Sequence, residues 1–407
     1  MTTLAAVAFL VWVPWSAANA RPELAAPTIS HSPRAFVTTN GDILAEHVMS
    51  VGTMRVLAIS GHFTEVTTAA GVTRRAANLA VINEATGHLL WTLHSISDGG
   101  YIRALASAKG LLYVGGDFTS VNGRTRSHVA AFHAGSGTIT PWSPTAHGNV
   151  EALAANKAVV FVAGNTGTVA ALARKGGAVT WSEAVNGQVR ALLRYPKAQA
   201  LYVGGYFDSI GGFTNHGLIR LNAGNGTPDH SFTPRLTPNG QPGPRPTYNG
   251  ENPFTLQIIG STSPAELLVG SGGVQNYIRV MNASTGAPVW SRFTVGDVQG
   301  VAVVGDSVVG GYHRWRTNFG THWPYFGAQL SIASGALTNW DPGLSGTQTE
   351  ADNGGNGIQA MVYDARTHEL FVGGGFTTFG ASCDPDKATS CTGGSPLHSL
   401  AEYKVTP

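Results

Sequence analysis

Residues 112–142, LYVGGDFTSVNGRTRSHVAAFHAGSGTITPW, contain a phrase that recurs along the chain. It returns as LYVGGYFDSIGGFTNHGLIRLNAGNGTPDHSF from Leu201, as LFVGGGFTTFG from Leu370 and in weaker form as LAISGHFTEV from Leu57. Self-similarity at a spacing of tens of residues indicates an array of one supersecondary unit. The repeat therefore decides the fold.

The glycine-rich phrase occurs at seven places, centred on Gly61, Gly116, Gly164, Gly205, Gly272, Gly311 and Gly374. Each copy follows a β-branched and aromatic run, and similar runs such as YIRALAS and HVAAFH lie upstream and downstream. A short fourth run then ends at an aromatic residue: Trp91, Trp142, Trp181, Phe232, Trp290 or Trp340. Four antiparallel strands per repeat predict an all-β, seven-bladed β-propeller. We expect the aromatic residues to pack between blades and the glycines to relieve crowding where strands bend.

The last repeat stops at Pro407 without its fourth strand, whereas a spare strand, RAFVTT, stands at residues 34–39. We expect this N-terminal strand to complete the last blade and close the ring. The expected organisation is a signal peptide at 1–20, a linker at 21–33 and a single propeller at 34–407.

Composition supports a turn-rich β protein, with 53 Gly, 21 Pro and 12% charged residues. The net charge of +2, without a long basic run, argues against a nucleic-acid binder. An apolar run from Leu4 to Trp15, followed by Ala-Asn-Ala, favours export to the cell exterior or cell envelope. No second long apolar run follows, so we expect no transmembrane segment in the mature chain.

The repeated phrase resembles the delta-sixty-type repeats of secreted bacterial propellers. The turns NEATGHLLW and NASTGAPVW are also similar to the Thr-Gly-x-x-x-Trp docking turn of pyrroloquinoline-quinone-type propellers. These resemblances cover most of residues 34–407 and imply a fold more than an activity, since fold does not imply function.

The longer loops fall between strands two and three and between blades, which share one face, so that face is the candidate binding face. There the sixth repeat carries a basic and aromatic cluster: His313, Arg314, Trp315, Arg316, His322 and Trp323. The equivalent loops of blades one and two carry further basic residues: Arg74, Arg75, Arg124, Arg126 and His128. Aromatic faces beside forked donors suit a carbohydrate or an acidic glycan. The alternative is that the tryptophans cap the channel and the arginines are solvated or paired.

Three further predictions concern smaller groups. Glu350, Asp352 and Asn353 form a candidate calcium site, against the alternative of a polar turn, and no other cofactor is expected. Cys383 and Cys391 are expected to form a local disulfide. We expect a binding or scaffold module for an extracellular ligand or a cell-envelope glycan or protein, with a quinoprotein-like oxidoreductase or a glycan lyase or hydrolase as the alternatives.

Overall fold

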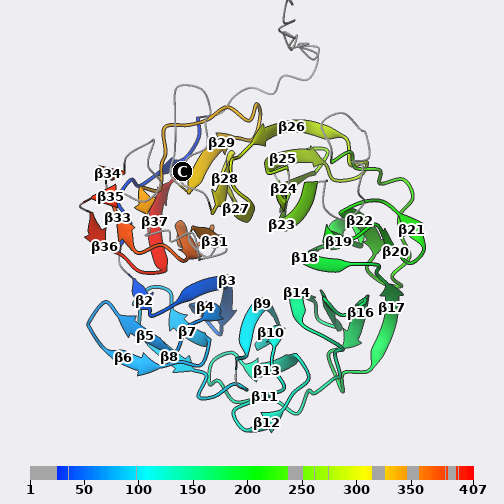
Figure 1. The fold of residues 1–407 in the computed structure, drawn as a ribbon, viewed down its shortest axis with the longest axis horizontal. Helices are drawn as coiled ribbons and strands as arrows, with labels where there is room; N and C mark the ends of the chain where they lie inside the picture. Colours follow the sequence, from blue (N-terminus) through cyan, green and yellow to red (C-terminus); the bar gives the residue numbers. More distant parts are fainter. Residues whose placement is uncertain are drawn as a thin grey trace, which may run out of the picture.

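The structure is a computed structural model that describes residues 25–34, 36–97, 99–236, 251–260, 262–273, 275–313, 326–345, 357–380, 382–383, 391–392 and 394–407. Within these residues, seven inner strands surround a central channel (Figure 1). They are β3 (Asp42–Val51), β9 (Tyr101–Ala108), β14 (Val150–Ala155), β18 (Gln188–Tyr195), β23 (Glu251–Ile259), β27 (Val298–Val304) and β31 (Ile358–Asp364). Each contacts the next in this order, and β31 contacts β3. The predicted all-β propeller is confirmed.

Outside each inner strand lie a second and a third antiparallel strand. The second strands are β4 (Met54–His62), β10 (Leu111–Asp117), β15 (Val159–Gly164), β19 (Ala200–Tyr206), β24 (Glu266–Gly273), β28 (Ser307–Tyr312) and β32 (Glu369–Gly374). The third are β7 (Leu79–Asn83), β13 (Val129–His133), β16 (Thr168–Ala173), β22 (Leu218–Asn222), β25 (Tyr277–Asn282), β29 (Gly327–Ser331) and β37 (Leu400–Thr406).

The fourth, outer strand varies from blade to blade. It is regular as β8 (Leu89–Thr92), β17 (Val179–Ala184) and β26 (Pro288–Phe293). In blades two, four and six the described residues reduce it to single bridges: Phe132 with Ile139, Leu221 with Pro228 and Leu330 with Leu337.

The N-terminal segment closes the ring, but not with the strand that the sequence predicted. Strand β1 (Thr28–Ile29) pairs with β37, six residues upstream of the predicted start of the closing strand, and Arg34 adds one bridge to Glu402. The second half of RAFVTT forms β2 (Val37–Thr39), which pairs instead with β5 (Glu65–Thr68) of blade one. The prediction that residues 34–39 form the closing strand is wrong, because that segment is divided between two neighbouring blades.

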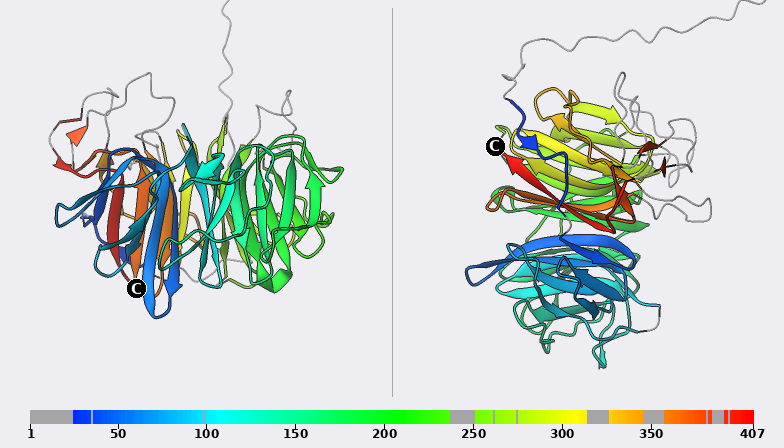
Figure 2. Two further views of the ribbon diagram at one scale, coloured as in Figure 1. Left: turned by 90° about the horizontal axis from the view of Figure 1, so that it is seen from below. Right: turned by 90° about the vertical axis from the view of Figure 1, so that its left-hand side faces the viewer.

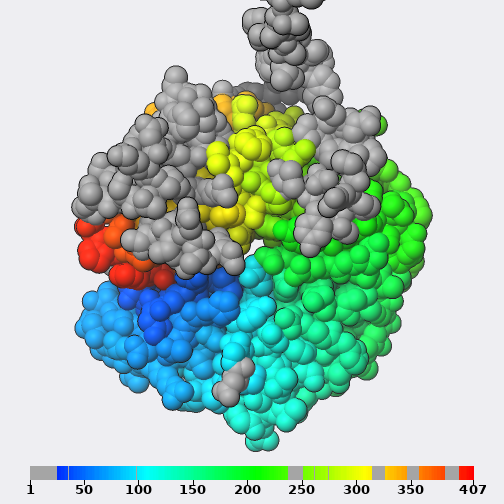
Figure 3. All heavy atoms as spheres, in the orientation of Figure 1, coloured from blue at the N-terminus to red at the C-terminus, as the bar shows by residue number. Residues whose placement is uncertain are grey.

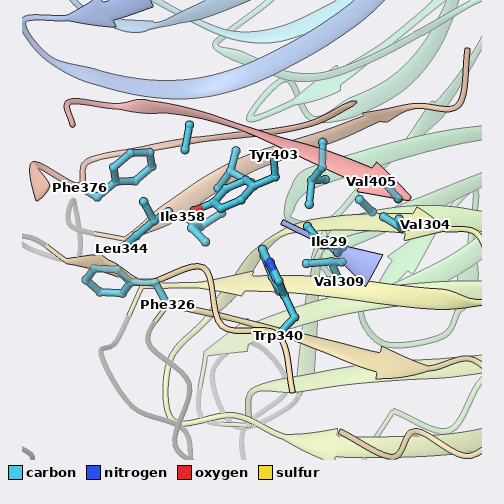
Figure 4. Packing of buried hydrophobic residues seen from close by; sticks show 14 of the residues in the cluster. Ile29, Val304, Val309, Phe326, Trp340, Leu344, Ile358, Phe376, Tyr403 and Val405 are labelled. Carbon is cyan, nitrogen blue, oxygen red and sulfur yellow. The ribbon is translucent and has the colours of Figure 1, made fainter. Parts of the chain in front are cut away.

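Blades six and seven meet in a continuous apolar core (Figure 4). Ile29 of β1 lies in it beside Val304, Val309, Trp340 and Val405. Full burial of one such aliphatic side chain contributes roughly 1.5–3 kcal/mol. The closing strand is therefore held by side-chain packing as well as by its short ladder.

Aromatic residues dock each blade on the next, as predicted. The Trp91 indole N–H donates to the Ala134 carbonyl at 2.8 Å, and the Trp290 indole N–H donates to that of Ile332 at 2.7 Å. Blade four has Phe232, which has no donor, and there the Tyr202 hydroxyl donates to the corresponding carbonyl, that of Ala283, at 2.5 Å. The repeat thus conserves the contact between blades even where the residue type changes.

The two ends of the ring differ (Figure 2). At one end strands one and two join through short turns, one of them the 3₁₀ segment η2 (Pro196–Ala198). At the other end lie excursions between strands two and three: β5 with β6 (Thr73–Arg75), β11 (Ser120–Val121) with β12 (Arg124–Thr125), β20 (Ser209–Ile210) with β21 (Phe213–Thr214), and β33 (Thr378–Phe379) with β36 (Ser395–Pro396). Strand β30 (Leu344–Ser345), from the connection between blades six and seven, pairs with β33. We call this second end the elaborated face.

Candidate functional site

Every inner strand carries a β-bulge close to its first residue. The register jumps from Ile43 to Ala45 in β3, for example, and the same shift recurs in the other six inner strands. The residues left unpaired are Leu44, Arg103, Glu151, Arg190, Phe254, Gln299 and Gln359, which we name the bulge ring. Bulges re-aim side chains and are common beside functional sites. Here they direct one side chain per blade toward the channel.

The recurrent glycine of the second strand has a steric cause at this bulge. In blades one, two, three, four and seven the residue paired just before the bulge is glycine: Gly61, Gly116, Gly164, Gly205 and Gly374. A Cβ at any of them would lie 1.8–2.2 Å from a carbonyl oxygen of the bulged strand. In blades five and six, the residues paired just before the bulge are Ser271 and Tyr312. The glycines of these two second strands lie one position away from that pair. The expectation that glycine relieves crowding is confirmed for these five blades.

The bulge ring lines a cavity of about 180 Å³ in the channel, together with residues just beyond the bulges such as Glu46 and Met361. Figure 3 shows the channel opening at the centre of the ring. Because the inner strands begin at the elaborated face, the cavity lies toward that end. The candidate site is therefore this cavity and the rim above it.

Charge in the ring is concentrated on three consecutive blades. The Glu151 carboxylate lies 2.9 Å from a guanidinium nitrogen of Arg190 and 3.7 Å from Nε of Arg103. The Gln188 amide also donates to this carboxylate, and the Arg190 guanidinium lies 5.0 Å from the centroid of the Phe254 ring. Two guanidinium groups share one carboxylate, which leaves this arc with one excess positive charge.

Burial and the neighbouring Arg190 together lower the pKa of Arg103 to about 10, against the opposing effect of Glu151. The two guanidinium groups therefore repel each other in a partly dehydrated channel. Such an arrangement favours an additional negative charge nearby.

Glu46 departs from the repeat two residues after the bulge. The equivalent residues are all apolar: Leu105, Leu153, Leu192, Leu256, Val301 and Met361. Both Glu46 carboxyl oxygens are shielded from solvent without a hydrogen-bond partner among the described residues, and burial raises the pKa of this carboxyl well above its usual value. One oxygen packs against Gly373 of blade seven, where a Cβ would lie 2.5 Å away. A protonated, neutral carboxyl is the form that this position favours.

Of the predicted ligand-binding residues, the described part of the chain includes His313. Its Nδ1 lies 3.8 Å from the Asp297 carboxylate at the start of blade six, so it stands at the channel rim. Arg314, Trp315, Arg316, His322 and Trp323 lie outside the described residues, as do the candidate calcium ligands Glu350, Asp352 and Asn353.

The basic residues predicted in the first two excursions lie where expected. Arg74, Arg75 and Arg124 are exposed on strands β6 and β12. Arg126 is buried and donates to the carbonyls of its neighbour Thr125 and of Thr140, both at 2.7 Å, so its role is structural.

Cys383 and Cys391 lie opposite each other in the two-stranded ladder of β34 (Ser382–Cys383) and β35 (Cys391–Thr392). Facing Cα atoms of antiparallel strands are about 4.5–5.5 Å apart, within the range that a disulfide spans. The side chains lie outside the described part of the structure, so the bond remains a prediction.

Comparison with known proteins places the chain in a family. Residues 75–318, more than half of the chain, match the family described as outer membrane protein assembly factor BamB. The chain belongs to this family. The predicted similarity to pyrroloquinoline-quinone-like repeats is supported by this match.

Solved structures support the fold alone, because their sequence identities are low. A chain of the mitotic checkpoint complex is 15% identical over 99% of both chains, with a TM-score of 0.59. The WD40 β-propeller domain of Doa1 is 12% identical over 91% of this chain and 96% of the domain, with a TM-score of 0.52. No curated protein matches the sequence. Among the described residues, no helix has the length and apolar character needed to cross a membrane.

Sequence reasoning missed the bulge ring, although a signal was present. IRAL, VEAL and VRAL, at residues 102–105, 150–153 and 189–192, each place one charged residue between an apolar residue and alanine. Simple alternation assigns that residue to a face of the blade, whereas the bulge turns it toward the channel.

Proposed function

We propose that this protein is an exported, non-catalytic propeller that binds an extracellular or cell-envelope ligand on its elaborated face. Membership of a family described as an outer membrane assembly factor supports a scaffold role at the cell envelope. The predicted signal peptide at residues 1–20 supports export.

The observation that carries this proposal is the asymmetry between the two ends of the ring. The described excursions lie at the end where the inner strands begin and the bulge ring opens. Binding residues are commonly placed on loops that a rigid scaffold positions. A ring with one plain end and one elaborated end is suited to presenting a single binding face.

The proposed ligand is a carbohydrate with acidic groups. The exposed Arg74, Arg75 and Arg124 provide forked donors on this face, and His313 stands at the rim. In this proposal Arg314, Trp315, Arg316, His322 and Trp323 continue the face with further donors and aromatic surfaces.

The quinoprotein alternative fits the channel poorly. Cofactor sites usually enclose about 300–1,000 Å³, whereas the channel cavity has about 180 Å³. The described channel residues therefore favour a smaller occupant than a tricyclic quinone.

A glycan array probed with the mature protein, beginning at Arg21, tests the proposal. We expect binding to acidic glycans that is lost when Arg314 and Arg316 are both replaced by alanine, with little change in melting temperature. The matched control replaces Lys157 and Lys175, two exposed cations at the opposite end, and should bind normally. Equal binding by both double variants, or a melting temperature that falls sharply in the arginine variant with binding intact, contradicts the proposal.

A further inference from the structure

We propose that the bulge ring is a binding site for one small carboxylate-bearing molecule, held in the channel by Arg103 and Arg190. This site is separate from the loop surface of the proposed function and does not depend on what that surface binds.

The side chains of the bulge ring converge on one cavity. Each ring residue is the unpaired residue of a bulge, and all seven line the same cavity. In blades two, three and four, each bulge has a glycine on the facing strand with no room for a Cβ. The backbone therefore holds Arg103 and Arg190 in position before any ligand arrives, and such preorganisation reduces the entropy lost on binding.

Arg103 and Arg190 carry more positive charge than Glu151 balances. Glu151 is 6% exposed and pairs closely with Arg190, while its 3.7 Å separation from Arg103 exceeds hydrogen-bond distance. Among the described residues, no hydrogen bond from the Arg103 guanidinium is found. Its forked N–H groups therefore remain available for the planar, bidentate contact that a carboxylate offers.

Aromatic and amide groups contribute to the rest of the cavity wall. Phe254 provides an aromatic face beside Arg190, and Gln299 and Gln359 provide side-chain amides across the channel. Glu46 also lines the cavity, but burial raises the pKa of its carboxyl, and the neutral form does not repel an anion. Cationic, aromatic and amide groups together suit a molecule with one carboxylate and several hydroxyls.

The volume of the cavity limits the size of its occupant. A cavity of about 180 Å³ corresponds to roughly six water molecules at about 30 Å³ each. This space suits a single sugar acid or a similarly small organic acid. It excludes a folded partner.

The experiment uses glucuronate as the probe, with glucose and sulfate as comparisons, in titration calorimetry of the full mature protein at low salt. We expect saturable 1:1 binding of glucuronate, weakened at least tenfold by Arg103→Gln and reduced by added NaCl. Glutamine is already the ring residue of blades six and seven, so the ring should tolerate it. Glucose and sulfate should bind at least tenfold more weakly than glucuronate.

The control is Lys157→Gln, which removes one exposed positive charge at the opposite end of the ring and should leave glucuronate binding like that of the wild type. If Arg103→Gln unfolds the protein, Arg103→Lys keeps the charge without the fork and should still weaken binding. The proposal is overturned if glucuronate does not bind, if Arg103 variants bind it normally, or if Lys157→Gln weakens binding as much as Arg103→Gln does. Failure of the glycan array leaves this result unaffected, so the two proposals fail separately.

Discussion

Replacing Glu46 with leucine is expected to stabilise the protein, although the change lies in the wall of the channel cavity. The other six blades have Leu, Val or Met at this position, so the site between blades accepts an aliphatic side chain. The Glu46 carboxyl oxygens are shielded without partners. A buried polar group without a hydrogen bond costs about 1–3 kcal/mol. Glu46→Leu should therefore raise the free energy of unfolding by about 1–3 kcal/mol even where the carboxyl is neutral.

The increase in the free energy of unfolding caused by Glu46→Leu should become larger as pH rises. Burial raises the folded-state pKa of Glu46, so the folded protein keeps this proton while the unfolded chain releases it near pH 4.3. The stability of the wild type therefore does not suffer from this proton uptake below the unfolded-state pKa, and it falls as pH rises from there toward the folded-state pKa of Glu46. Each pH unit in this window lowers wild-type stability by about 1.4 kcal/mol relative to the leucine variant. Buried His47 has its pKa lowered to about 4, and its titration is common to both proteins.

Urea unfolding at pH 4.5 and pH 7 measures both the cost of burying the unpaired carboxyl and its dependence on pH. Glu46→Gln is the matched control. The amide cannot ionise but leaves a polar group buried, so this control should remove the pH dependence while recovering less stability than leucine. The reasoning is refuted if Glu46→Leu is less stable than the wild type at pH 7. It is equally refuted if the difference does not change between the two pH values.

Three other changes test separate parts of the fold. Gly116→Ala places a Cβ about 2.0 Å from a backbone carbonyl oxygen and should lower the melting temperature markedly, whereas a neutral effect would show that the bulge is not sterically required. Arg279→Met leaves the buried Glu251 carboxylate without its 2.6 Å partner and should cost about 3–5 kcal/mol in denaturant unfolding. A smaller loss would mean that Glu251 takes up a proton in the variant, because burial raises its pKa to about 7 even against the opposing effect of Arg279. A thiol assay of the unreduced, denatured exported protein should detect no free thiol from Cys383 and Cys391, and two thiols would disprove the disulfide.

The sequence alone determined the blade, because the blade is a local object repeated along the chain. Alternating β-branched runs predict strands, and the aromatic residue ending a repeat, such as Trp91, predicts docking on the next blade. The glycine-rich phrase was recognisable for the same reason. The atom that crowds each glycine was not, because the carbonyl oxygen that excludes a Cβ belongs to another segment of the chain.

The tertiary structure alone decided which N-terminal residues close the ring and where the channel site forms. Thr28 pairs with Thr406. No local sequence pattern shows which N-terminal residues will pair with a strand so distant in sequence. Strand periodicity also misplaces Arg103 and Arg190, because one extra residue in each bulge shifts the alternation of side chains. Only the closed ring places the bulges of separate blades at the same level of the channel. The charge cluster of Arg103, Glu151 and Arg190 comes from three blades, so no single repeat shows it.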